Sequence, residues 1–456
     1  MIPQDFLKTL AAEHGVSDTE LEALWLAVDG DSTTAIAQKL EISEDAVRKR
    51  LSEVYRKFKV SGSGVKLGRL QQLIISRYQE YEAQRNSGSS SNQVSSRREN
   101  NQPRQIWGEA PDVSVFYGRT EELATIEQWI VKEGCRLVGL LGMGGIGKTT
   151  LSVKLARQIQ DKFEYVIWRS LRNAPPIKEV LADLIKFLSY PQETDLPEVL
   201  DERVSRLISY LREHRCLLVL DDVETIVRNN DRIWRYNEGY DGYGILLKRV
   251  GEGQHQSCLV VCSLEKPREI ALLESPTGFV RSLELTGLKQ EAAQKILQDK
   301  GLTGEQHWKD LIQTYRGNPL ALKIVATIIK DVFSNNIAEF LKGDFLIVSD
   351  IFREILEWQF QRLSNLEKEI MYYLARENAP VSFLNIREDR QTKVTNTESL
   401  IEAIESLSWR SLIEQVKSED KDTSETLFTL QPVIKKYVNQ YYLPSNPRTE
   451  QSWFTE

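Results

Sequence analysis

The sequence has no long apolar run and few cysteines. No stretch approaches the ~18 apolar residues of a membrane-spanning helix, and residues 1–5 lack the pattern of a signal peptide. The four cysteines show no C-x-x-C spacing and lie in or beside apolar runs, so we expect buried, reduced thiols rather than metal ligands. They are Cys135, Cys216, Cys258 and Cys262. These absences favour a cytoplasmic protein with no membrane partner.

The chain also lacks an excess of basic residues. Its net charge of −7 argues against a protein that coats nucleic acid, although a local basic face is still allowed. There is no internal repeat with a period of 20–50 residues. A length of 456 residues predicts about three domains.

A glycine-rich turn is the most informative motif. The apolar run Leu137–Leu141 reads as a buried parallel strand and leads into a turn that opens a helix with Leu151, Val153 and Leu155 inward. The turn matches G-x-x-x-x-G-K-[ST] with the strand and helix that this phosphate-binding loop (P-loop) requires, so a plain glycine turn is the minor alternative. Its residues are Gly142, Met143, Gly144, Gly145, Ile146, Gly147, Lys148, Thr149 and Thr150.

Each part of the turn has a chemical role in binding a nucleotide. Glycines let successive backbone N–H groups converge on phosphate oxygens, and the helix N-terminus favours negative charge. Lys148 can reach the β- and γ-phosphates, and the Thr149 hydroxyl can bind Mg²⁺. We therefore expect a bound nucleotide with its magnesium ion.

Two adjacent carboxylates follow a second apolar run. The strand predicted for residues 216–222 ends in Asp221 and Asp222, at the sheet edge where parallel α/β sheets bind ligands. We expect Asp221 to hold Mg²⁺ and Asp222 to orient or deprotonate a water molecule. An exposed acidic turn is the alternative.

The central region, residues 106–285, alternates strands and helices. Further strands are predicted at residues 165–169, 257–263 and 280–285, which makes five in a doubly wound parallel sheet. Residues 236–244 are rich in glycine and tyrosine and are expected to form a long loop. Residues 286–343 read as a helical domain, residues 344–445 as a winged-helix domain, and residues 446–456 as a tail.

Residues 1–85 read as a helical module, joined to the rest by a flexible linker at residues 86–105. The pattern is that of a helix-turn-helix: a short helix, a turn, and a longer helix that Ser43 caps. The module resembles the LuxR-type DNA-binding fold. Arg48, Lys49 and Arg50 would be the DNA contacts. The module holds 12 basic and 13 acidic residues, however, so an adaptor that binds a protein effector is the other interpretation.

Residues 107–442 resemble the NB-ARC branch of the STAND ATPases, most closely the cyanobacterial type with an N-terminal helical module. The motifs are residues 116–119, the P-loop, residues 217–222 and Gly317-Asn318-Pro319-Leu320. The resemblance implies that the helical domain is a lid over the base, that ADP holds a closed form, and that exchange for ATP opens the protein to form homo-oligomers. Outside the P-loop it implies nucleotide contacts from Phe116, Tyr117, Gly118, Arg119, Pro319, Leu320 and Gln431.

Three positions depart from the family. An arginine that senses the γ-phosphate is replaced by Leu264, and Arg169 is a candidate substitute. The histidine that contacts ADP in the winged-helix domain is replaced by Gln431, which is uncharged. Relatives carry a sensor repeat array after this region, and none appears before Glu456, so we expect sensing by a further segment or another chain.

The sequence therefore predicts a multidomain fold with a P-loop parallel sheet, a helical lid, a winged-helix domain and an N-terminal helix-turn-helix-like module. We expect a signalling switch operated by ADP and ATP, with weak hydrolysis in which Lys148 and Asp222 take part. The alternatives are an ATP-dependent, DNA-binding transcriptional regulator and a motor-type ATPase with continuous turnover. The leucine at position 264 argues against the motor, because no other charge stabiliser is evident.

Overall fold

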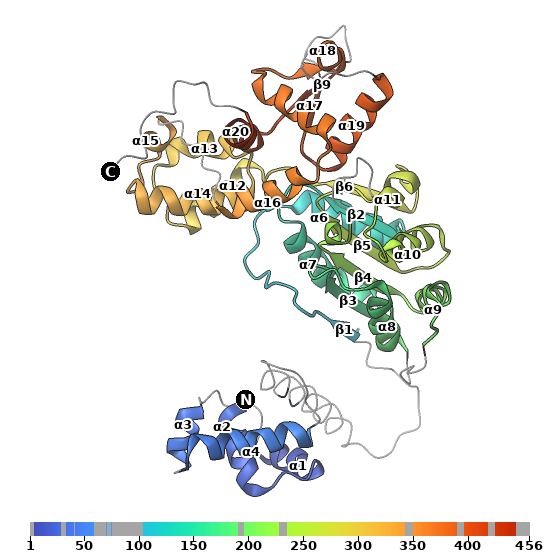
Figure 1. Cartoon of the computed structure of the whole chain (residues 1–456), viewed down its shortest axis with the longest axis vertical. Helices are drawn as coiled ribbons and strands as arrows, with labels where there is room; N and C mark the ends of the chain where they lie inside the picture. The colour runs from blue at the N-terminus through green and yellow to red at the C-terminus, as the bar shows by residue number, and fades with distance from the viewer. Residues whose placement is uncertain are drawn as a thin grey trace. The chain divides into compact units, whose positions relative to one another are not determined.

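The computed structural model describes residues 4–28, 33–40, 42–58, 70, 74, 104–189, 196–227, 235–342, 350–389, 396–417 and 425–443. The chain divides into two compact units, Met1–Glu99 and Asn100–Glu456. Figure 1 labels their helices and strands. Most of the expected linker (residues 86–105) and the whole expected tail (residues 446–456) lie outside the described residues.

The first unit contains the predicted helix-turn-helix. Its helices are α1 (Gln4–Glu13), α2 (Asp18–Val28), α3 (Thr33–Lys39) and α4 (Glu44–Lys57). The hydroxyl of Ser43 accepts a hydrogen bond from the backbone amide of Ala46 over 3.2 Å, which caps the start of α4. Val47 and Val54 of α4 are buried in the apolar core of the unit. The predicted order of a short helix, a turn and a longer helix is confirmed.

The second unit is built on a parallel sheet of six strands, one more than the sequence predicted. The spatial order is β1-β3-β4-β5-β2-β6. The extra strand, β1, pairs with β3 over three residues, all of them exposed, so no apolar pattern marks it. Residues 104 and 105 therefore belong to the sheet, and their assignment to the linker was wrong. The strands are β1 (Arg104–Ile106), β2 (Leu137–Leu141), β3 (Tyr165–Ser170), β4 (Cys216–Asp221), β5 (Cys258–Ser263) and β6 (Val280–Glu284).

Helices cover both faces of this sheet (Figure 1). Alternate side chains of a strand point to opposite layers, so Val138 faces one layer and Leu137 the other. The first layer is α6 (Thr120–Glu127), η1 (Gln128–Lys132) and α7 (Lys148–Ile159). The second is α8 (Ile177–Leu188), α9 (Leu200–Glu213), α10 (Asp241–Glu252) and α11 (Arg268–Leu273). Short helical turns η2 (Gln160–Lys162) and η3 (Val223–Ile226) follow α7 and β4.

The loop predicted for residues 236–244 is shorter than expected, because α10 begins at Asp241. Two glycines of the predicted loop, Gly242 and Gly244, lie in α10 and allow close packing. A Cβ atom added at Gly242 would lie 2.7 Å from the Leu200 side chain, and one at Gly244 would lie 2.7 Å from the Tyr236 ring. The sequence showed the glycines but not the neighbours that require them.

Two helical regions follow the sheet. The lid comprises α12 (Gln290–Asp299), η4 (Glu305–His307), α13 (Trp308–Thr314), α14 (Pro319–Val332) and α15 (Ile337–Lys342). The winged-helix domain comprises α16 (Asp350–Gln361), α17 (Asn365–Arg376), α18 (Phe383–Glu388), α19 (Thr397–Trp409) and α20 (Pro432–Tyr441), with an antiparallel sheet of β7 (Val381–Ser382), β8 (Glu414–Lys417) and β9 (Thr426–Thr429). A single apolar cluster runs through both regions and includes Met143 of the P-loop.

The predicted burial of the four cysteines is confirmed. Burial raises the pKa of the Cys258 and Cys262 thiols well above the ordinary value, which keeps them protonated. Among the helices of the described ranges, none has the length and apolar character needed to cross a membrane.

Candidate nucleotide-binding site

The P-loop has the strand, turn and helix that its motif requires. β2 ends at Leu141, and α7 begins at Lys148. Between them, Gly142, Gly145 and Gly147 have φ angles of 137°, 76° and 101°, a region that side chains with a Cβ atom rarely adopt. The backbone of the turn thus depends on these glycines, and the N-terminus of α7 points its free amides at the turn.

The ammonium group of Lys148 is buried against the turn. Its Nζ donates hydrogen bonds to the carbonyl oxygens of Gly142 (2.7 Å) and Met143 (3.2 Å). Burial lowers the pKa of Lys148, and the nearby carboxylates of Glu224 and Asp221 oppose that shift. The side-chain nitrogen of Lys148 therefore lies at the base of the turn, where the motif expects phosphate oxygens.

Thr149 and Asp221, the two residues predicted to bind magnesium, lie next to each other. Burial raises the pKa of the Asp221 carboxyl to about 6, the charge of Asp222 adds to the rise, and a hydrogen bond from Thr149 lowers it. A hydroxyl and a carboxylate are the oxygen donors that Mg²⁺ prefers. The described residues contain no cluster of three side chains for a metal, but Mg²⁺ usually takes one or two protein ligands plus substrate phosphates. The donor set fits this ion.

The two adjacent acids have different neighbours. Asp222 has a φ angle of 58°, so the backbone turns sharply after β4. Its Oδ2 accepts a hydrogen bond from the Ser170 hydroxyl over 2.9 Å and lies 3.5 Å from Nε of Arg172. The two carboxylates thus have different hydrogen-bond and ion-pair partners. Arg172 is a lone arginine in a loop and carried no sequence signal.

A third carboxylate was missed. Glu224, in η3, is buried, and burial raises its pKa to about 7 while the charge of Lys148 opposes the rise. Its Oε2 accepts a hydrogen bond from the backbone amide of Leu264 over 3.2 Å. A third acid two residues after Asp222 was the available signal.

Arg169 does not replace the missing arginine. Its Nη1 forms an ion pair with Asp183 of α8 at 2.7 Å, and α8 lies on the face of the sheet opposite α7. Leu264, at the family's arginine position, is buried and contributes its backbone amide to Glu224. The proposal that Arg169 acts as a substitute is therefore wrong.

The lid contacts the P-loop directly. The side-chain amide of Asn318 donates to the carbonyl oxygen of Gly144 over 3.0 Å, and the backbone amide of Leu320 donates to that of Gly145 over 3.3 Å. A Cβ atom at Gly145 would lie 2.6 Å from Cβ of Leu320. Pro319 occupies the first turn of α14, where its missing N–H costs nothing. The structure brings the predicted lid residues to the phosphate loop.

Tyr117 and Gly118 contact the first lid helix. The Tyr117 hydroxyl donates to Oδ2 of Asp299 over 2.5 Å, and this carboxylate raises the pKa of Tyr117 to about 12. A Cβ atom at Gly118 would lie 2.6 Å from Cβ of Ala292. Phe116 is half-buried on the sheet side. This segment therefore lies where the sheet meets the lid.

Arg119 binds the protein itself. Its buried guanidinium donates to the carbonyl oxygens of Ile146 (3.0 Å) and Thr286 (2.7 Å) and pairs with Glu122 at 2.7 Å. It fixes the P-loop to the start of the lid connection. The remaining predicted site residues are Thr150, half-buried in α7, and Gln431, half-buried just before α20.

Two protein families match the chain. The model of the NB-ARC domain matches residues 119–240, which include the P-loop and both aspartates. The chain carries an NB-ARC domain. The model of the bacterial regulatory proteins of the luxR family matches residues 14–65, which include α2, α3 and α4. Both resemblances predicted from the sequence are confirmed, and the NB-ARC match supports nucleotide binding.

The similar curated proteins are longer than this chain. An uncharacterized WD repeat-containing protein of Nostoc sp. is 46% identical over 365 residues, which cover 77% of this chain and 28% of that protein. A probable disease resistance protein of Arabidopsis thaliana is 22% identical over 268 residues, covering 55% of this chain and 34% of its own length. The chain thus spans about a third or less of these relatives.

Two solved structures from Pyrococcus match part of the chain. A Walker-type ATPase of P. abyssi matches 71% of this chain and 96% of its own, with 14% identity and a TM-score of 0.43. A STAND protein of P. horikoshii with a tetratricopeptide repeat sensor matches 76% of this chain and 44% of its own, with 18% identity and a TM-score of 0.37.

Proposed function

We propose that this chain is a signalling switch in which bound ADP favours a closed form and exchange for ATP opens it to form a homo-oligomer. The observation that carries the proposal is the pair of hydrogen bonds from Asn318 and Leu320 to the P-loop carbonyls of Gly144 and Gly145. The same loop holds Lys148. A movement of the lid would therefore change the shape of the phosphate site.

The roles of the site residues follow from their surroundings. Lys148 and the amides of the turn bind the phosphates, and Thr149 with Asp221 holds Mg²⁺. The ion would neutralise phosphate charge when bound. Asp222, oriented by Ser170, positions a water molecule. Hydrolysis is expected to be slow, because Leu264 and the paired Arg169 leave the family's arginine position without a cation.

The nucleotide carried by the purified protein, together with its size, tests this proposal. We expect ADP to be released on denaturation, a monomer in ADP, and a larger species by light scattering in a non-hydrolysable ATP analogue. Lys148→Ala should weaken nucleotide binding about tenfold or more, since one charge-assisted contact is worth roughly 1.5–3 kcal/mol. Lys162→Ala removes an exposed lysine of the same domain and should leave binding unchanged. Full affinity in Lys148→Ala would contradict the P-loop assignment.

A second function is favoured by the luxR-family match at residues 14–65. In that alternative the chain is an ATP-dependent transcriptional regulator, and Arg48, Lys49 and Arg50 of α4 contact DNA phosphates. A protein effector bound by the same module is the other output that fits a switch. Binding of the full chain to duplex DNA separates these two outputs.

A further inference from the structure

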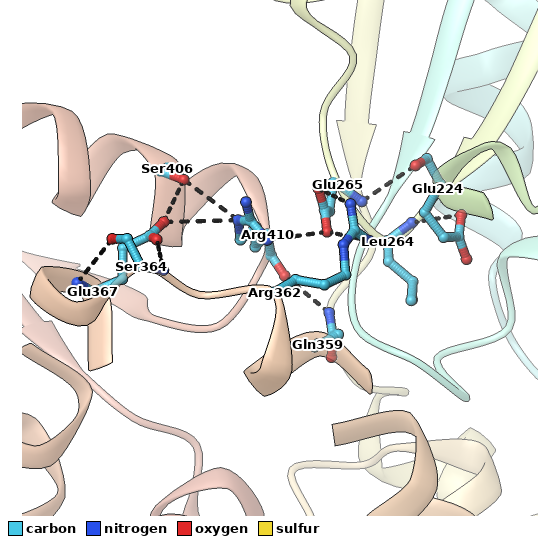
Figure 2. Close-up of polar contacts among 10 residues, drawn as sticks. Glu224, Leu264, Glu265, Gln359, Arg362, Ser364, Glu367, Ser406 and Arg410 are labelled. Carbon is cyan, nitrogen blue, oxygen red and sulfur yellow. Dashed lines mark hydrogen bonds and ion pairs between the residues drawn. The ribbon is translucent and has the colours of Figure 1, made fainter. Parts of the chain in front are cut away.

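Four charged side chains form a buried cluster where the nucleotide-binding domain meets the winged-helix domain (Figure 2). Glu265 follows β5, Arg362 follows α16, Glu367 lies in α17 and Arg410 follows α19. All four are at most 4% exposed. Two positive and two negative charges balance one another inside the protein.

Glu265 is the carboxylate that joins the two domains. Its Oε1 lies 2.8 Å from Nη1 of Arg362 and 3.4 Å from Nη1 of Arg410. Beside it, the backbone amide of Lys266 donates to the carbonyl oxygen of Trp409 over 2.9 Å. The end of β5 is thus held against the C-terminal end of α19 by side-chain and backbone contacts.

Within the winged-helix domain, part of the cluster is held by contacts that do not involve Glu265. Glu367 accepts hydrogen bonds from the Ser406 hydroxyl (2.6 Å) and the Ser364 amide (2.6 Å), and lies 3.8 Å from Nε of Arg410. Arg410 therefore keeps one carboxylate when the domains separate. Arg362 stacks on the Trp358 ring at 4.3 Å, and Glu265 is its ion-pair partner among the described residues.

A chain of charges leads from this cluster to the phosphate site. Glu224 interacts with Lys148 of the P-loop, and it also accepts the amide of Leu264, the residue next to Glu265. Burial lowers the pKa of Arg362, whereas Glu265 and Glu224 raise it, so the guanidinium senses both carboxylates. Figure 2 shows Glu224 and Leu264 on one side of Glu265 and the arginines on the other.

We propose that Glu265, Arg362 and Arg410 form an ionic latch that holds the winged-helix domain closed and controls nucleotide release. Buried ion pairs are either fully made or fully broken, because an unpaired charge in a dry site is costly. Such a cluster gives two discrete arrangements rather than a gradual motion. The inference rests on the proposed switch and names the contact that regulates it.

The rate of ADP release from the full chain tests the latch. Glu265→Gln removes the shared negative charge and leaves two guanidinium groups facing each other. We expect release of a fluorescent ADP about tenfold faster than from the natural chain, within the roughly 5–150-fold range of coupled sites. Glu265→Asp keeps the charge and should restore slow release in part.

A matched control separates the latch from general destabilisation. Leu400→Ala creates a cavity in the same winged-helix domain, since Leu400 is buried in the first turn of α19, whereas Arg410 follows the end of that helix. It should lower the melting temperature without changing ADP release. Equal release from Glu265→Gln and the natural chain would overturn the latch, as would equal acceleration by Leu400→Ala.

Hydrogen exchange of the natural chain tests the latch without any variant. This measurement therefore still tests the proposal when Glu265→Gln does not fold. Replacing ADP by an ATP analogue should expose the amide of Lys266, because its acceptor, the carbonyl oxygen of Trp409, belongs to the winged-helix domain. Unchanged protection in a chain that still enlarges with the analogue would overturn the latch and leave the switch standing. A natural chain that binds no nucleotide would overturn both.

Discussion

The side-chain amide of Asn318 donates a hydrogen bond to the carbonyl oxygen of Gly144 over 3.0 Å, while its Oδ1 accepts from the amides of Leu320 and Ala321. One buried side chain therefore both caps α14 and holds the P-loop. Proline at the next position cannot donate a hydrogen bond, so the asparagine supplies the polar contact at this helix start. The lid and the phosphate loop share this residue.

Asn318→Ala should weaken both interactions. Removing an N-cap typically costs about 0.5–2 kcal/mol, and the Gly144 carbonyl is deprived of its donor as well. We expect a lower melting temperature and ADP release at least about fivefold faster, at the lower end of coupling between sites. Asn396→Ala removes the N-cap of α19, where the Asn396 side chain accepts from the Glu398 amide, and should lower stability alone. If both variants release ADP at the natural rate, the lid does not depend on this hydrogen bond.

Substitution of the two aspartates should give different results. Asp221→Asn removes the charge beside Thr149, so binding should lose its dependence on Mg²⁺. Asp222→Asn keeps the hydrogen bond from Ser170 and should bind ATP normally, with single-turnover hydrolysis about a hundredfold slower, as for loss of a general base. Calorimetry with and without Mg²⁺ and phosphate release measure the two effects. One shared phenotype would contradict the division of roles.

The pH dependence of stability should reveal Glu224. Its pKa is raised to about 7, so between about pH 4.5 and 7 the folded chain holds a proton that the unfolded chain has lost. The stability from this group is therefore present at low pH and decreases as the pH rises to 7. Glu224→Gln stays neutral, so its stability relative to the natural chain should improve from pH 5 to pH 8, by up to about 3 kcal/mol.

Melting curves of both chains across this range, without nucleotide, measure the difference. Other carboxylates titrate equally in the two proteins and cancel. A constant difference from pH 5 to pH 8 would mean that Glu224 keeps an ordinary pKa in the folded chain.

Much of the nucleotide site was predictable because its signals are local. The P-loop and the strand that ends in Asp221 are continuous motifs, and each binds through its own backbone or adjacent side chains. Lid contacts through residues 317–320 were implied by the family resemblance. The three-residue strand β1 was not predictable, since its exposed side chains have no pattern and only pairing with β3 defines it.

The missed residues depend on interactions between distant segments. Glu265 binds Arg362 and Arg410, which lie 97 and 145 residues away in the sequence, and no local pattern links them. Arg169 failed as a substitute for a similar reason: alternation along β3 turns its side chain to α8, away from α7. The sequence named Arg169 as a candidate but could not place its side chain on either face of the sheet.

The final prediction concerns the basic residues of α4. Arg48 pairs with Glu44 at 2.9 Å and with Asp45 at 3.0 Å, and Arg50 donates to the carbonyl oxygen of Thr19 over 3.1 Å. Exposed ion pairs are weak, so phosphates can compete for Arg48, but the acids beside it remain and oppose DNA. The nearly equal numbers of acidic and basic residues in the module also disfavour DNA binding.

We therefore expect the full chain to leave random duplex DNA unretarded at ~50 mM salt, where nonspecific binding is strongest. A DNA reader would retard it there and release it by ~200 mM salt. Replacing Arg48, Lys49 and Arg50 together by alanine would then lower the salt slope by about one for each phosphate that is no longer bound. A gel-shift titration of the natural and triple-alanine chains, each with ADP or an ATP analogue, decides between the two outputs. Salt-sensitive retardation that the triple variant abolishes would establish DNA as the partner, and its appearance with one nucleotide alone would place DNA binding under the control of the switch.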